Sequence, residues 1–130
     1  MITITIPGNP RTKKNSQQIL TNKKTGRSFI APSKAFKQYQ KEADAAIPQD
    51  VRKAIDYRVT VKCLYFMHTL RAVDLSNLLE ATDDILTHCG ILADDNCRVI
   101  ASHDGSRVLY DKLNPRAEVY ITPFDEEGTL

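Results

Sequence analysis

Apolar and polar residues alternate along residues 56–68, and this alternation predicts a β-strand with two different faces. One face would carry Val59, Val61, Cys63, Tyr65 and Met67. The other face becomes apolar toward Leu64 and Phe66, so that end is expected to be covered as well. Similar runs predict further strands at residues 1–6, 97–103 and 116–122.

A second pattern, with apolar residues three and four positions apart, predicts an α-helix over residues 75–89. Its buried stripe would consist of Leu75, Leu78, Leu79, Thr82, Ile85, Leu86 and Cys89. Gly90 is placed where a left-handed residue ends a helix. Another helix is expected over residues 34–47, between an N-capping Ser33 and Pro48.

The remaining segments predict turns and loops around these elements. Residues 18–20 and 27–31 are expected to form a hairpin that turns at Gly26, after a loop over residues 7–17. An arm rich in turn residues links the last two strands. This order of elements favours an α+β fold in which helices pack on a mixed β-sheet.

Length and composition favour a single-domain protein without a membrane span or a secretory signal. The chain has 130 residues, which is typical of one domain, and residues 124–130 are expected to form a flexible tail. No apolar run is long enough to span a bilayer, and the N-terminus lacks the pattern of a secretory signal. The three cysteines form no CxxC pair, which is typical of a cytoplasmic protein.

Charge is distributed unevenly along the chain. Residues 1–41 contain nine of the 18 Lys and Arg residues and no Asp or Glu. Residues 72–97 contain six acidic residues and no Lys or Arg. The basic segment is either an ordinary solvated surface or a surface that binds a polyanion.

The predicted helix at residues 75–89 has an acidic face opposite its apolar stripe. Asn77, Glu80, Asp84 and His88 follow one another along it, with no basic residue between them. Asp74 begins the same helix, and the Asp94–Asp95 pair follows it. Gathered carboxylates without basic partners would favour a hard divalent cation such as Mg²⁺ or Mn²⁺. Alternatively, Asp74 caps the helix, Asp94 and Asp95 form a turn, and Glu80 and Asp84 are solvated.

Residues 73–100, VDLSNLLEATDDILTHCGILADDNCRVI, resemble the RusA family of Holliday-junction resolvases. The family pattern is D-x-D-N-L-x-K, an Asp on the same helix, and a D-D pair before a strand. This chain matches it at Asp74, Asn77, Leu78, Asp84, Asp94 and Asp95. The start, ITIPGNPRTKKNS followed by a basic helix, is similar to the family too. Ser76 and Glu80 depart from it, where the family has Asp and Lys.

The resemblance implies a Mg²⁺-dependent endonuclease that resolves four-way DNA junctions, with Mn²⁺ as a second candidate metal. The expected metal ligands are Asp74, Asp95, Glu80 and Asp94, and the expected catalytic residues are Asp74, Asp95, Glu80 and Asp84. Because Ser76 removes one family ligand, two interpretations remain. Glu80 completes a rearranged active site, which is the preferred interpretation, or the protein binds junctions without cutting them.

The basic residues are the expected DNA contacts, since phosphate contacts position a protein without reading sequence. The candidates are Arg11, Lys13, Lys14, Asn15, Lys23, Lys24, Arg27 and Arg71. Two symmetric cuts in a four-way junction call for a homodimer. The histidines, including His103, lack zinc-site spacing and are expected to be structural or exposed. The expected location is the cytoplasm of a bacterial or phage-infected cell.

Overall fold

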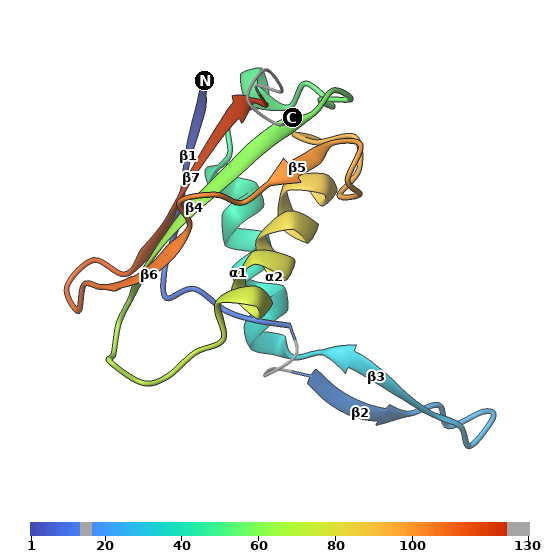
Figure 1. Cartoon of the computed structure of the whole chain (residues 1–130). Helices are drawn as coiled ribbons and strands as arrows, with labels where there is room; N and C mark the ends of the chain where they lie inside the picture. The colour runs from blue at the N-terminus through green and yellow to red at the C-terminus, as the bar shows by residue number, and fades with distance from the viewer. Residues whose placement is uncertain (14–16, 125–130) are drawn as a thin grey trace.

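The computed structural model describes residues 1–13 and 17–124, and two helices cover one face of its main β-sheet (Figure 1). The sheet has five strands in the order β1-β7-β4-β5, with β6 also paired to β4. Their bounds are β1 Ile2–Pro7, β4 Val59–Met67, β5 Ile100–Ser102, β6 Arg107–Tyr110 and β7 Arg116–Pro123. Strand β7 is antiparallel to β1 and β4, whereas β5 and β6 are parallel to β4. The predicted α+β class with a mixed sheet is therefore confirmed.

The predicted hairpin is also present, as a separate two-stranded sheet. It consists of β2 (Gln17–Thr21) and β3 (Ser28–Pro32), and it projects away from the main sheet (Figure 1). Its turn is closed by hydrogen bonds between Asn22 and Arg27 and between Gly26 and Asn22, both 2.8 Å. Lys14, Asn15 and residues 125–130 of the predicted tail lie outside the described residues, whereas Phe124, the first residue of that tail, donates its N–H to the Arg58 carbonyl at 3.0 Å.

Both long helices begin at the residues that the sequence predicts, and each ends one residue earlier than predicted. Helix α1 (Lys34–Ala46) starts at Ser33, whose hydroxyl accepts a hydrogen bond from the Phe36 N–H at 3.1 Å. Helix α2 (Leu75–His88) starts at Asp74, and Gly90 follows it with a φ of 77°. A short 3-10 helix, η2 (Gln49–Val51), follows α1.

The core lies between the helices and the sheet. The predicted inner face of β4, from Val59 to Met67, is buried throughout. Helix α2 packs Leu78, Ile85 and Leu86 against it, with Phe36, Tyr39 and Ala43 from α1. One buried polar contact joins the two layers. The Tyr65 hydroxyl donates to Thr82 Oγ1 at 2.7 Å, and Thr82 in turn donates to the Leu78 carbonyl at 2.9 Å.

Two strand predictions need correction. The strand predicted over residues 97–103 covers only Ile100–Ser102, because the N–H groups of Val99 and Ile100 bond to the Asn96 carbonyl in a turn. The predicted arm between the last two strands contains β6, which pairs with β4 from Leu64 to Met67. Its residues are all exposed, so they lack the buried face that produces a clear alternation.

Candidate active site

Asp74 forms the N-cap of α2. Its Oδ1 accepts hydrogen bonds from the N–H groups of Ser76 at 2.9 Å and Asn77 at 3.4 Å. A carboxylate is favourable here because the helix N-terminus carries unsatisfied N–H groups and partial positive charge. The capping interpretation of Asp74 is therefore confirmed. Only one of the two carboxylate oxygens takes part in the cap.

An open hollow of about 410 Å³ lies between α2 and the segments on either side of β5. It is lined by Ser76, Leu79, Glu80, Asp83, Asp95 and His103. The fold thus brings together two predicted site residues, Glu80 and Asp95, that are distant along the chain. Asp74, Asp84 and Asp94 are not among the lining residues.

Asp94 and Asp95 differ in how their side chains are used. Both Asp94 oxygens support the turn, because Oδ1 accepts from the Asp95 N–H at 2.7 Å and Oδ2 from the Asn96 amide at 3.1 Å. The turn interpretation is therefore confirmed for Asp94. Asp95 lines the hollow, where partial desolvation, the Asp94 side chain and the charge of Asp84 raise its pKa.

Asp84 has a basic partner, contrary to the expectation that the acidic face of α2 lacks one. The Lys13 ammonium lies 2.6 Å from Asp84 Oδ2, and their side chains are 36% and 31% exposed. The same ammonium lies 5.9 Å from the centre of the Phe36 ring. The expectation was wrong because the cation comes from the loop after β1 and not from α2 itself.

Asp83 and His103 form a second charged contact in the hollow, and neither was predicted as a site residue. His103 Nε2 lies 2.9 Å from Asp83 Oδ2, and Nδ1 lies 2.9 Å from the Val61 carbonyl oxygen. The carbonyl only accepts, so Nδ1 carries a proton. The contact with Asp83 then needs a further proton, either on Nε2 or on the carboxylate.

The surroundings keep that proton bound. Burial raises the pKa of Asp83, although the hydrogen bond from His103 opposes the rise. Burial alone would lower the pKa of His103, but the Asp83 carboxylate and the Val61 carbonyl outweigh it and raise this pKa. Asp83 stands in the acidic run next to Asp84, but no pattern in the sequence identifies His103 as its partner.

The donor set of the hollow fits a hard divalent cation. Glu80 and Asp95 offer carboxylate oxygens, and desolvation, the Asp94 side chain and the charge of Asp84 together raise the pKa of Asp95, which a bound cation would offset. Within residues 1–13 and 17–124, no group of three or more His, Cys, Asp or Glu side chains is placed to hold a metal ion. Mg²⁺ does not require one, since it is commonly bound by one or two carboxylates together with water and substrate phosphates.

The basic candidates lie on two different parts of the molecule. Lys23, Lys24 and Arg27 are exposed at the end of the hairpin that projects from the body. Arg11 is exposed on the loop after β1, and Arg71 is exposed on the segment between β4 and α2. Lys14 and Asn15 are not described.

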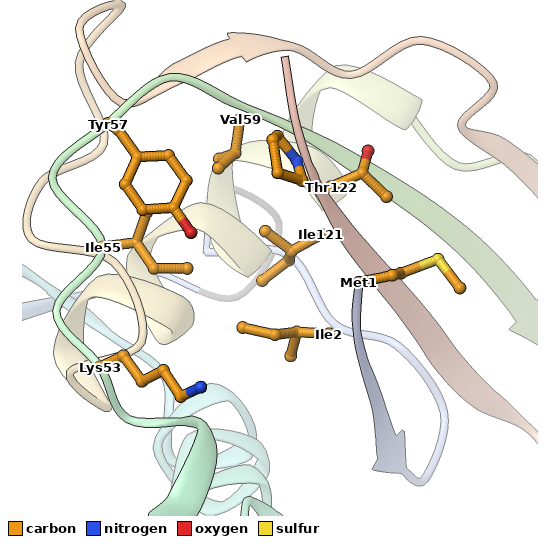
Figure 2. A pocket seen from close by; sticks show the side chains of 9 residues that line it. Met1, Ile2, Lys53, Ile55, Tyr57, Val59, Ile121 and Thr122 are labelled. Atoms are coloured by element: carbon orange, nitrogen blue, oxygen red, sulfur yellow. The ribbon is translucent and has the colours of Figure 1, made fainter. Parts of the chain in front are cut away.

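A separate hollow of about 210 Å³ lies between the start of β1, the end of β7 and the segment before β4. Figure 2 shows the side chains of Ile2 and Ile121 within it and those of Lys53 and Tyr57 at one side. Its lining includes no carboxylate. It therefore lacks the carboxylates that make the acidic hollow a candidate metal site.

The sequence matches no model of a known protein family and no curated protein. Among the residues described here, no helix is both long and apolar enough to cross a membrane.

Proposed function

We propose that this protein is a Mg²⁺-dependent endonuclease that cuts four-way DNA junctions. The observation that carries the proposal is the acidic hollow, which Glu80, Asp83 and Asp95 line, while Lys13 of the basic N-terminal loop contacts Asp84 on the same helix. The resemblance of residues 73–100 to RusA resolvases supports the same reaction. Hydrolysis of a phosphodiester suits such a site, since both substrate and acids are negative and a cation is needed between them.

Each residue around the hollow has a distinct task in this proposal. Glu80 and Asp95 would hold a Mg²⁺ ion, which would supply activation of water and stabilisation of charge on the leaving oxygen. Asp74 fixes the start of α2 through its Oδ1 and, as the family resemblance implies, would offer its other carboxylate oxygen to the ion, while Asp94 fixes the turn that presents Asp95. Lys13 brings positive charge to the acidic face, where the polypeptide has Glu80 in place of the family lysine.

In this proposal, the exposed hairpin β2–β3 binds the DNA. Lys23, Lys24 and Arg27 lie at its tip and would contact phosphates along one arm of a junction. A homodimer would place one hollow at each of two symmetric cuts. In this proposal the protein works in the cytoplasm of a bacterial or phage-infected cell.

A second candidate function is binding of branched DNA without cutting. It is favoured by Ser76, which lines the hollow at the place of a family carboxylate, and by the lack of a three-ligand group among the described residues. In this case the acidic face would serve to position Lys13 and the N-terminal loop.

Cleavage of a synthetic four-way junction distinguishes the two functions. The junction and a linear duplex of the same sequence are incubated with the protein in Mg²⁺, Mn²⁺ or EDTA. We expect paired cuts in the junction with either metal, no cuts in EDTA and little cutting of the duplex. Tight junction binding without cuts under any metal would establish the second function instead.

A further inference from the structure

A polar pocket of about 410 Å³ lies between the loop after β1 and the segment that leads from β4 to α2. Its polar lining consists of Asn9, Arg11, Thr12, Thr69 and Arg71. Hydrogen bonds within and between these two segments shape the pocket. Asn9 Oδ1 accepts from the His68 N–H at 2.9 Å, and Thr69 Oγ1 accepts from the Arg71 N–H at 3.4 Å.

The charge in this pocket is unbalanced. Arg11 and Arg71 both line it, and no carboxylate does. Neither guanidinium forms an ion pair with any residue in the described part of the chain. Two other arginines do form ion pairs with carboxylates. Arg52 lies 2.7 Å from Asp44, and Arg116 lies 3.0 Å from Asp111 and 2.9 Å from Glu118.

We propose that this pocket binds a phosphate group, and that its occupant is a phosphodiester of the DNA backbone. Two guanidiniums from separate loops present planar sets of donors that match phosphate oxygens. Asn9, Thr12 and Thr69 add polar groups at the same place. The assignment of the phosphate to DNA rests on the proposed function, whereas the assignment of the pocket to a phosphate group does not.

Each of the two segments that line the pocket is close in sequence to a residue at the acidic helix α2. Thr12 lines it and precedes Lys13, which contacts Asp84 at 2.6 Å. Arg71 lines it and stands three residues before Asp74, the cap of α2. A DNA strand held here by one phosphate would therefore be anchored beside the helix that carries Glu80.

The direct test uses inorganic phosphate as the probe. Phosphate is titrated into the isotope-labelled full chain, and backbone amide shifts are followed by NMR. We expect saturable shifts at Thr12, Thr69 and Arg71, and weakening of phosphate binding by about tenfold or more in Arg11→Gln and Arg71→Gln. Arg107→Gln, which removes an exposed arginine on β6, is the matched control and should bind as wild type does. No saturable shifts, or equal binding by all variants, would overturn the pocket.

The source of the phosphate is tested with an uncleavable four-way junction. The junction should displace inorganic phosphate from the pocket, and the Arg11→Gln/Arg71→Gln variant should lower the salt-dependence slope of junction binding by about one, as expected for the loss of one phosphate contact. If phosphate binds but the junction does not displace it, the pocket is not a DNA site and the phosphodiester assignment fails. Failure of the wild type to cut junctions, with displacement intact, would refute the nuclease but support the pocket.

Discussion

The Lys13 ammonium lies 2.6 Å from the Asp84 carboxylate and joins the basic start of the chain to its acidic helix. The two residues are 71 positions apart. Through this contact, a lysine of the predicted DNA-binding segment lies against α2, the helix that lines the acidic hollow. Its positive charge therefore lies near the proposed active site.

Replacing Lys13 by Met should slow cutting of bound junctions, because the Asp84 charge then repels the DNA phosphate without compensation. The free energy of unfolding should change by no more than about 1 kcal/mol, since the pair is partly exposed. Lys24→Met is the matched control on the hairpin, and it should weaken binding without slowing the cut. Single-turnover kinetics and chemical denaturation measure both effects. The proposed role of Lys13 is wrong if the two variants behave alike.

Replacing Asp95 by Asn, or Glu80 by Gln, should reduce cutting by more than about 100-fold, as expected for groups that contact the metal directly. Junction binding should stay equal or become tighter, because a negative charge is removed. Asp50→Asn, on the exposed 3-10 helix, is the control. Full activity of Glu80→Gln would show that Glu80 has not replaced the missing family carboxylate.

Asp74→Asn separates the capping role from a catalytic one. Asn caps a helix about as well as Asp, so the unfolding free energy should be nearly unchanged. We expect loss of cutting, because the substitution removes the carboxylate charge at the start of α2. Cutting at the wild-type rate, measured on the same junction, would limit Asp74 to its cap.

The Asp83–His103 contact predicts a stability that falls as pH rises. Both groups have raised pKa values, so the folded protein holds more protons than the unfolded chain. The His103 contribution is complete below its ordinary pKa of 6.5 and is lost as pH rises through the higher folded value. The raised pKa of Asp83 acts in the same direction above 3.8. Urea denaturation from pH 5 to 9 measures the trend.

His103→Gln is the matched variant for that experiment. It should show a weaker fall in stability over the same pH range, because its amide does not titrate. An identical pH dependence in wild type and variant would show that the pair holds no extra proton in the folded state.

The hydrogen bond between the buried hydroxyls of Tyr65 and Thr82 predicts that removing either hydroxyl lowers the free energy of unfolding by a different amount. Thr82→Val leaves the buried Tyr65 hydroxyl without its acceptor and should cost about 1–3 kcal/mol. Tyr65→Phe should cost less, because Thr82 keeps its bond to the Leu78 carbonyl. The double variant should be nearly as stable as Tyr65→Phe. Thermal or urea unfolding of all three gives the comparison, and additive losses would contradict it.

The helices and main strands follow from local patterns. Helix α2 has an apolar stripe with a period near 3.6, an Asp at its start and a Gly after its end, and all three signals lie within residues 74–90. The alternation along β4 predicts its buried face in the same way. Such signals act between near neighbours, so the sequence alone determines them. The acidic character of α2 was visible in the same way, whereas a site shared with Asp95 was implied only by the family resemblance.

Only the tertiary structure decided which charged groups meet. Lys13 reaches Asp84 because the loop after β1 passes the exposed side of α2, and His103 reaches Asp83 because β5 pairs beside β4. Strand β6 needed the same information, since its pairing with β4 extends an edge that β5 begins. These contacts depend on strand order and register, which are set by burial across the whole sheet and leave no pattern in any one segment.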